Sequence, residues 1–232
     1  MILLLNGCKG RMGQALTRLC EKQGHTVWGA DLHQPLSALP QGEVLVDFSC
    51  ASALETVLEE ALKRNIPAVI CSTGHTEAQR DAIAAAAQKI PIFYSGNMSL
   101  GVAQLCRMVR ETVKLFPQAQ VEIVETHHIH KKDAPSGTAR MLFEAVKEAR
   151  PEAVMTCGRQ GLCPRQENEV GVHALRMGEV IGIHEVHIAT PTQTLTLRHE
   201  AHDRALFAEG ALEAARFLTD KAPGLYNMMD LV

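Results

Sequence analysis

The sequence lacks several features that mark specialised classes of protein. No apolar run approaches the ~20 residues that a helix needs to cross a bilayer. The seven cysteines are scattered and form no C-x-x-C pair, which argues against a zinc ribbon and indicates reduced thiols. The opening segment MILLLNG has no basic region before its short apolar run, so we expect no signal peptide and a cytoplasmic protein.

An excess of positive charge is also missing. The chain carries 23 Lys and Arg residues against 26 Asp and Glu residues, a formal net charge of -3. A general nucleic-acid-binding protein is usually basic, so we expect neither nucleic acid nor a membrane as a partner. With 232 residues, of which 46% are hydrophobic, the chain can bury a large core without disulfides or a metal. That length fits one larger domain or two small ones.

Short apolar runs alternate with helical segments through the first part of the chain. The runs that predict strands are 1–7, 25–31, 43–48, 67–71 and 91–94. Helices are predicted over about 13–23, 52–64 and 77–89, whereas 33–42 is too short for a full crossover helix. This β-α-β alternation, with nearly continuous apolar strands, predicts a parallel sheet that has helices on both faces.

The pattern changes after residue 98. Helices are predicted over 100–115, 136–150 and 203–219, and strands over 121–128, 171–177, 180–190 and 193–200. The segment TLTLRHE alternates polar and apolar residues, so one face of its sheet is expected to be solvated. The second part is therefore predicted to be α+β with an antiparallel or mixed sheet. Residues 156–170 are polar and aperiodic, which predicts a mobile loop.

A glycine-rich segment, GCKGRMG at residues 7–13, follows the first predicted strand and opens a helix. Closely spaced glycines permit a tight turn and let backbone N–H groups approach a pyrophosphate at a helix N-terminus. Lys9 and Arg11 could also meet phosphate. Three close glycines can equally be an ordinary turn, but the strand–turn–helix position favours a dinucleotide-binding role.

Polar residues follow other predicted strands of the same sheet. Asp31 ends the second strand, where a carboxylate accepts hydrogen bonds from an adenosine ribose and disfavours a 2′-phosphate, so it favours NADH over NADPH. His33 could share this role, and a solvated turn is the alternative for Asp31. The segments 71–74 (CSTG) and 96–99 (GNMS) end the fourth and fifth strands, where ligands of parallel sheets bind. Turn and cap chemistry explains them equally well.

The segment ETHHIHKKDAPSGTA, residues 125–139, concentrates titratable groups. Histidine titrates near neutral pH and lysine supplies a positive donor, a combination that suits acid–base chemistry on a small anionic substrate. On an extended strand, His127 and Lys131 would lie about 13 Å apart, so they can share a substrate only if the chain curls after His128. Ser136 is a predicted N-cap, and the N–H groups of the helix that follows would attract a carboxylate.

Three other interpretations of this segment compete. A zinc site could use His127, His128 and His130, but the usual helical spacing is absent and adjacent strand residues point apart. The segment could be a solvated basic loop. Ser136 could be a nucleophile, although no G-x-S-x-G elbow surrounds it. We expect no metal.

The pattern E-x-H-H-x-H-K-x-D-A-P-S-G-T-A resembles the signature of the 4-hydroxy-tetrahydrodipicolinate reductase (dihydrodipicolinate reductase) family of bacterial lysine and diaminopimelate synthesis. Further matching segments along the whole chain are NGCKGRMG, VLVDFS, ICSTGH, SGNMSLGV and GLYNMMDLV. The resemblance implies a Rossmann-like parallel-sheet dinucleotide-binding domain over 1–98 and 203–232. It also implies an α+β substrate-binding and tetramerisation domain with a mixed sheet over 99–202. The implied activity of the homotetramer is NAD(P)H-dependent reduction of 4-hydroxy-tetrahydrodipicolinate, with hydride delivered to C4 and water lost.

The resemblance also assigns roles to residues. His127 would be the main catalytic acid or base and Lys131 the second proton donor. The residues that would bind the dicarboxylate substrate are His128, Gly137 and Thr138. Those that would bind the NADH or NADPH cofactor are Gly7, Cys8, Lys9, Gly10, Arg11, Met12, Asp31, Cys71, Ser72, Thr73, Gly96, Asn97, Met98 and Ser99. Cys71 departs from the family, which usually has glycine there.

Two alternative functions remain open from the sequence. A non-catalytic NAD(H)-binding sensor would use the same glycine turn but would not need the histidine–lysine segment. A reductase of another cyclic imine is the second alternative, which activity on the dipicolinate-series substrate would distinguish. The sequence assigns no role to His130 or Lys132 beyond charge and loop packing.

Overall fold

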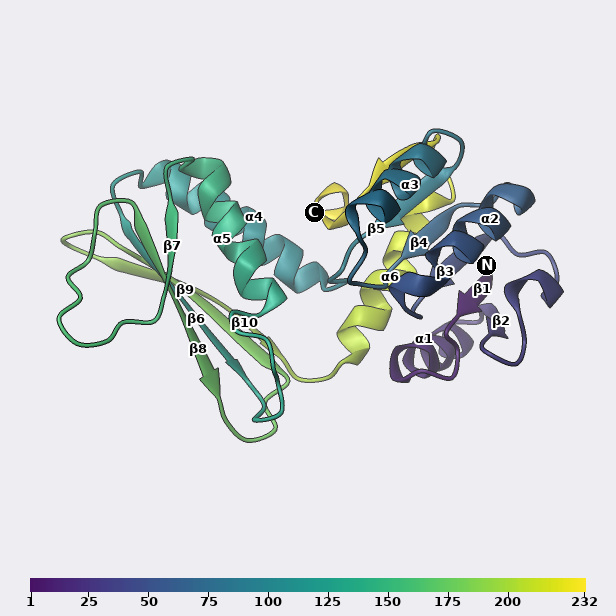
Figure 1. Ribbon diagram of the computed structural model, residues 1–232, viewed down its shortest axis with the longest axis horizontal. Helices are drawn as coiled ribbons and strands as arrows, with labels where there is room; N and C mark the ends of the chain where they lie inside the picture. The colour runs from purple at the N-terminus through teal and green to yellow at the C-terminus, as the bar shows by residue number, and fades with distance from the viewer. The chain divides into compact units, whose positions relative to one another are not determined.

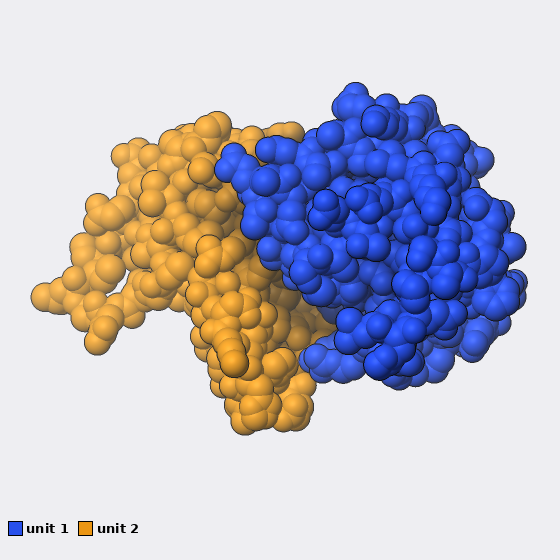
Figure 2. Space-filling model, turned by 45° about the vertical axis from the view of Figure 1, so that its right-hand side comes forward, with its two compact units in different colours: residues 1–100, 204–231 blue, residues 101–203, 232 orange.

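A computed structural model describes all residues of the chain, 1–232. The chain forms two compact units, which Figure 2 distinguishes by colour. The first comprises residues 1–100 and 204–231, and the second comprises residues 101–203 with Val232. None of the helices is long and apolar enough to span a bilayer.

The first unit is built on a parallel sheet. Its strands are β1 (Ile2–Asn6), β2 (Thr26–Ala30), β3 (Val44–Asp47), β4 (Ala68–Ile70), β5 (Pro91–Tyr94) and β11 (Gly224–Tyr226). They lie in the order β11-β5-β4-β3-β1-β2, and every neighbouring pair is parallel. The central strands are buried on both faces, which explains their continuous apolar sequences.

Helices cover both faces of this sheet (Figure 1). They are α1 (Arg11–Lys22), α2 (Leu54–Arg64), α3 (Glu77–Ala87) and α6 (Ala205–Leu218). Helices α2 and α3 share one apolar core with Leu4, Leu45 and Ile92 of the strands. Helix α6 packs against α1 and against β3, β4 and β5, where Phe217 meets Phe93 with ring centroids 6.3 Å apart. The predicted parallel sheet with helices on both faces is confirmed.

Two connecting segments of this unit, the one after β5 and the one between β2 and β3, are held by contacts to their backbone. A side chain at Gly210 of α6 would place its Cβ 1.6 Å from the carbonyl oxygen of Met98, so α6 lies directly against the segment after β5. The short connection between β2 and β3 contains a 3-10 turn, η1 (Leu36–Ala38), in place of a helix. Arg64 fastens this connection by donating to the carbonyl oxygen of Pro40 at 2.8 Å and of Leu36 at 3.0 Å. Two more 3-10 turns are η2 (Ala51–Ala53) and η3 (Met228–Leu231).

The second unit contains a mixed sheet and two helices. The strands are β6 (Gln120–His127), β7 (Val154–Cys157), β8 (Glu169–Arg176), β9 (Gly182–Ala189) and β10 (Thr194–Ala201), and the helices are α4 (Leu100–Leu115) and α5 (Gly137–Ala149). The order is β10-β9-β6-β8-β7. Strand β6 is parallel to β8 and antiparallel to β9, so the prediction of an antiparallel or mixed sheet is resolved as mixed.

Helices α4 and α5 lie on one face of the mixed sheet (Figure 1). Val109 and Leu142 from the helices share a core with Val121 and Ile123 of β6. Since alternate strand residues share a face, Glu125 and His127 continue this helix-covered face toward the end of β6. The register places Arg176 of β8 beside His127 and His184 of β9 opposite Glu125.

Two strands were missed from the sequence. Strand β7 occupies the start of the predicted mobile loop 156–170, and β8 takes its last two residues, so the connecting segment runs from 158 to 168. Strand β11 is three residues long. Both are edge strands of only three or four residues, too short to show a local alternation of polar and apolar side chains.

Candidate active site

The glycine turn between β1 and α1 tolerates no side chain at two positions. Gly7 has φ of +81°, and a Cβ there would lie 2.9 Å from the carbonyl carbon of Phe48. A Cβ at Gly13 would lie 2.3 Å from the carbonyl oxygen of Gly7. The N-cap of α1 is Gly10, so no side-chain oxygen caps the helix, and its first turn holds no acidic residue. The backbone N–H groups of this turn therefore suit an anion.

A cavity of about 640 Å³ lies beside this turn, at the carboxyl ends of β1, β2 and β3. The residues that line it include Asn6, Gly7, Lys9, Gly10, Asp31, His33, Ser49 and Cys50. The Lys9 Nζ lies 2.7 Å from the Asp31 carboxylate, which also accepts the backbone N–H of His33 at 2.7 Å. The hydrogen bond from Lys9, aided by that of His33, lowers the pKa of Asp31 to about 2. Asp31 is therefore an anion at this cavity at neutral pH.

A buried polar network joins the carboxyl ends of four strands in the same unit. Asp47 at the end of β3 is fully buried and accepts hydrogen bonds from Asn6 of β1 at 2.9 Å and from the Ser72 hydroxyl after β4 at 2.5 Å. His75 Nε2 lies 3.3 Å from the Ser72 hydroxyl, and its Nδ1 lies 3.3 Å from the hydroxyl of Tyr94 at the end of β5. These hydrogen bonds hold the loop after β4 in place, and the Ser72 hydroxyl is already engaged in them.

The two predicted segments after β4 and β5 come together. A Cβ at Gly96 would lie 3.3 Å from Thr73 Cγ2, so these two residues are neighbours. Ser99 donates its backbone N–H to the Asn97 side chain at 2.9 Å, which shapes the second segment. Cys71 is buried, and burial raises its pKa well above the ordinary range, so it stays a neutral thiol at this edge.

In the second unit, His127 is held by a buried carboxylate. Its Nδ1 lies 2.5 Å from Oε2 of Glu125, which is fully buried. Arg176 donates to both oxygens of Glu125, each at 2.9 Å, and the backbone N–H of Ser136 donates to Oε1 at 3.0 Å. Burial alone raises the pKa of Glu125, but the hydrogen bonds from His127, Arg176 and Ser136 outweigh it and bring the pKa to about 2. Glu125 is therefore ionised.

Ser136 connects this cluster to helix α5. It is the N-cap, and its hydroxyl oxygen accepts the backbone N–H of Ala139 at 3.1 Å, as predicted. The same oxygen lies 3.1 Å from Nε2 of His184. Burial, with a further contribution from His127, lowers the pKa of His184 to about 3, so this imidazole is neutral. The rings of His127 and His184 meet edge to face with centroids 5.1 Å apart.

The segment after β6 turns sharply. The backbone N–H of Lys131 donates to the carbonyl oxygen of His128 at 3.1 Å, so the chain curls where extended geometry would have separated His127 from Lys131. The Lys131 ammonium lies 2.8 Å from the carboxylate of Asp133. A Cβ at Gly137 would meet nothing within 4 Å, so the first turn of α5 has open space beside it. No group of three or more His, Cys, Asp or Glu side chains is placed to hold a metal ion.

Several residues of these clusters were not predicted as site residues. Glu125 could have been found, because two residues that are two apart on a strand share a face and the pattern E-x-H placed a carboxylate beside His127. Arg176, His184 and Asp47 gave no such signal, because their partners lie on strands distant in the sequence. Ser136 was predicted as a cap, without its contact to Glu125.

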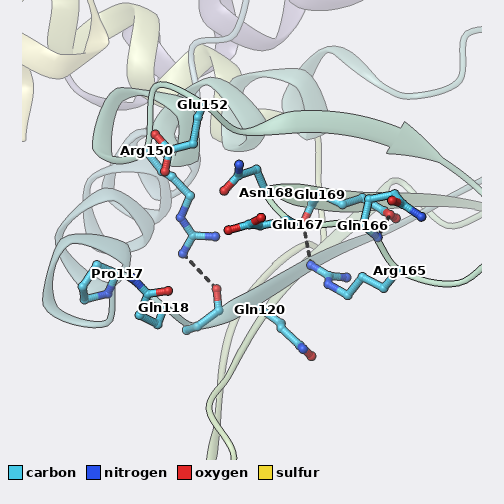
Figure 3. A pocket seen from close by; sticks show the side chains of 11 residues that line it. Pro117, Gln118, Gln120, Arg150, Glu152, Arg165, Gln166, Glu167, Asn168 and Glu169 are labelled. Carbon is cyan, nitrogen blue, oxygen red and sulfur yellow. Dashed lines mark hydrogen bonds between the residues drawn. The ribbon is translucent and has the colours of Figure 1, made fainter.

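A second polar cavity, of about 550 Å³, lies elsewhere in the second unit and includes no predicted site residue. Figure 3 shows Arg150 and Arg165 on its walls together with Glu152, Glu167 and Glu169. Arg150 donates to the carbonyl oxygen of Ala119 at 2.8 Å, and Arg165 donates to that of Val121 at 3.1 Å. These arginines are engaged with the protein itself, in a wall that also carries acidic side chains.

Comparison with known proteins identifies the family. Residues 1–98 match the model of the dihydrodipicolinate reductase N-terminus, and residues 101–232 match the model of its C-terminus. The chain belongs to the dihydrodipicolinate reductase family. The prediction from the histidine signature is therefore confirmed, as is the two-part fold class.

Two relatives that match this chain along almost their whole length are both named 4-hydroxy-tetrahydrodipicolinate reductase. The 4-hydroxy-tetrahydrodipicolinate reductase of Alkaliphilus oremlandii is 41% identical over 100% of this chain and 98% of its own length. That of Caldanaerobacter subterraneus is 40% identical over 99% of this chain and 97% of its own. The dipicolinate-bound dihydrodipicolinate reductase from Paenisporosarcina sp. TG-14 has the same fold, with a TM-score of 0.81 at 21% identity, covering 100% of this chain and 99% of that one.

Proposed function

We propose that the protein catalyses the NAD(P)H-dependent reduction of 4-hydroxy-tetrahydrodipicolinate to tetrahydrodipicolinate in diaminopimelate and lysine biosynthesis. The observation that carries this proposal is the cluster of His127, Glu125 and Arg176 at the start of α5, in a chain that matches the family over its whole length. A non-catalytic NAD(H)-binding sensor would need no such buried acid–base cluster. It is not favoured.

The first unit would bind the dinucleotide. Its glycine turn leaves no room for side chains and presents helix N–H groups, so residues 7–12 suit the pyrophosphate. Asp31 suits the hydroxyl groups of the adenosine ribose, and the neighbouring Thr73 and Gly96 lie where ligands of parallel sheets bind. The assignment of Cys71, Ser72, Asn97, Met98 and Ser99 to this cofactor rests on their place in the same two segments. When bound, the nicotinamide supplies the hydride.

We also propose that NADH is preferred over NADPH. Asp31 is ionised at neutral pH, and its negative charge faces the position where a 2′-phosphate would add further negative charge. Lys9 offsets part of this repulsion because its ammonium lies 2.7 Å from the carboxylate. The preference is therefore expected to be moderate.

The second unit would bind the dicarboxylate substrate. The first turn of α5 has open space beside Gly137, and Gly137 with Thr138 would hold one substrate carboxylate there through backbone and hydroxyl groups. Lys131 would leave Asp133 to meet the substrate, and His128 would contribute a further polar contact. Reduction at C4 with loss of water consumes one hydride and one proton. With the ring imine as electron sink, hydride addition would leave a carbanion-like intermediate that takes up this proton. His127 would be the main acid or base for this transfer and Lys131 the second proton donor.

The domain roles follow from this division. Residues 1–98 with 203–232 form the dinucleotide-binding domain, and residues 99–202 form the substrate-binding and tetramerisation domain of a cytoplasmic homotetramer. The face of the mixed sheet opposite α4 and α5 would form the subunit interface. Leu175, which is 48% exposed there, supports this assignment. Light scattering of the purified protein tests the tetramer.

The activity is tested with substrate made freshly by the synthase that produces it. The nicotinamide absorbance is followed after addition of NADH or NADPH. We expect oxidation with both and a larger kcat/KM with NADH. If neither cofactor is oxidised, the proposal fails, and if another cyclic imine is reduced far faster, the alternative reductase takes its place.

A further inference from the structure

The carboxylate of Glu125 holds two parts of the proposed site together. Its Oε2 accepts from His127 Nδ1 at 2.5 Å and from Arg176 at 2.9 Å. Its Oε1 accepts from Arg176 at 2.9 Å and from the backbone N–H of Ser136 at 3.0 Å. Each oxygen therefore accepts two hydrogen bonds, and this fully buried side chain keeps all of its acceptor capacity in use.

We propose that Glu125 is a positioning residue that sets the tautomer of His127 and, through Ser136, the start of the substrate-binding helix α5, with Arg176 holding its carboxylate in place. This inference rests on the proposed reductase function for the role of His127. A buried carboxylate is an unfavourable choice for a merely space-filling position, where an apolar side chain of similar volume carries no desolvation cost. Residue 125 therefore needs the hydrogen-bond acceptors of a carboxylate, which an apolar side chain lacks.

The tautomer of His127 follows from the charge of Glu125. An ionised carboxylate can only accept hydrogen bonds, so the hydrogen between the two side chains belongs to His127 Nδ1. Nε2 is then the ring nitrogen that gains or releases a proton. A Cβ at Gly182 of β9 would lie 3.1 Å from this Nε2, so a side chain at residue 182 would crowd the nitrogen.

Two neighbours, Arg176 and His184, complete the surroundings of the Glu125–His127 pair. The guanidinium of Arg176 binds both oxygens of Glu125, so its positive charge offsets the carboxylate that faces His127. His184, on the other side, is neutral, and its ring meets that of His127 edge to face. The His127 imidazole is therefore oriented through Nδ1, and Nε2 is the nitrogen left for proton transfer in the proposed reaction.

The link to α5 predicts a second effect of Glu125. Ser136 is the N-cap of α5 and donates its N–H to Glu125, while its hydroxyl oxygen accepts from Ala139. Loss of the carboxylate would therefore loosen the first turn of α5, where Gly137 and Thr138 are proposed to bind a substrate carboxylate. Substrate affinity and turnover should fall together, whereas the NADH-binding residues lie in the other unit.

The experiment compares Glu125→Gln with Glu125→Asp in the full-length protein. Gln preserves volume but loses charge and one acceptor, whereas Asp preserves charge but loses volume. If Glu125 acts as an acceptor, Glu125→Gln should lower kcat by roughly 10²- to 10³-fold, within the usual range of general acid–base effects, and Glu125→Asp should retain more activity. The dissociation constant of NADH should be unchanged in both. Glu169→Gln, which alters another buried carboxylate of the same sheet, is the matched control and should keep the wild-type kcat.

The tautomer is read directly by long-range nitrogen–proton NMR correlations of ¹⁵N-histidine-labelled protein. We expect the wild-type His127 to carry hydrogen on Nδ1 and Glu125→Gln to lose this preference. A wild-type His127 with hydrogen on Nε2 alone would overturn the proposal without any variant. So would a Glu125→Gln variant with wild-type kcat, or one that is more active than Glu125→Asp.

If the Glu125 variants do not fold, Arg176→Lys provides a second route. Lysine keeps the charge but cannot bind both carboxylate oxygens as a planar fork, so we expect lower kcat with NADH binding retained. An Arg176→Lys variant with wild-type kcat and KM would count against the arrangement. Failure of the wild-type protein to reduce the proposed substrate would refute the reductase function, whereas the tautomer measurement does not depend on the substrate.

Discussion

Adding a single methyl group at Gly13 tests the proposed cofactor site. In Gly13→Ala the new Cβ would lie 2.3 Å from the carbonyl oxygen of Gly7 and 2.7 Å from the Cα of Cys8, both backbone atoms. Ordinary contact needs about 1 Å more, so the glycine turn or the start of α1 must move by that amount. Alanine is the better helix former by about 1 kcal/mol, while overpacking costs about 1–3 kcal/mol, so the net loss of stability should be small.

The loss of cofactor affinity should be much larger than the loss of stability. A turn displaced by about 1 Å loses at least one charge-assisted hydrogen bond to the pyrophosphate, worth about 1.5–3 kcal/mol, so NADH should bind roughly 10- to 100-fold more weakly. Fluorescence titration with NADH measures this, and thermal unfolding shows that the variant is folded. Gly137→Ala is the control, because its Cβ would meet nothing within 4 Å. A folded Gly13→Ala protein that binds NADH as tightly as wild type would refute the assignment of this turn to the cofactor.

Further predictions concern four other residues. Asp31→Asn removes the charge that faces a 2′-phosphate and should raise kcat/KM for NADPH relative to NADH; steady-state kinetics with both cofactors would contradict this if the ratio stayed constant. Lys131→Ala should lower kcat at unchanged NADH affinity, and equal loss of NADH binding would exclude its role as a proton donor. Because the pKa of Glu125 is depressed from 4.5 to about 2, its stabilising contribution is complete above pH 4.5 and is lost as the pH falls toward 2. Urea unfolding across this range should therefore show a steeper loss of stability for wild type than for Glu125→Gln. Gly210→Ala places a Cβ 1.6 Å from the Met98 carbonyl oxygen. Overpacking of about 1–3 kcal/mol, less the gain of about 1 kcal/mol in helix propensity, should lower the free energy of unfolding by up to about 2 kcal/mol, whereas Glu209→Ala, at an exposed position of the same helix, should not lower it.

Local sequence patterns determined most of the helices and strands, and also the helix starts at which candidate site residues lie. The apolar runs of the first unit form β1 to β5, and the glycine segment after β1 forms the turn into α1. Ser136 caps α5 as predicted, and Thr76 caps α3 through a hydrogen bond with the backbone of Gln79. These features depend on residues within a few positions of one another, so the chain reveals them without knowledge of the fold.

The tertiary structure alone decided how the proposed catalytic cluster around His127 is assembled. Glu125 and His127 share a face of β6, but Arg176 and His184 reach them only through the register of β8 and β9. Likewise, Asp47 joins Asn6 and Ser72 only because β1, β3 and β4 are neighbours in the parallel sheet. A sequence states which side chains a strand presents on each face. Which strand lies alongside, and in what register, depends on burial of the whole sheet against its helices, and this long-range packing gave His127 its buried carboxylate.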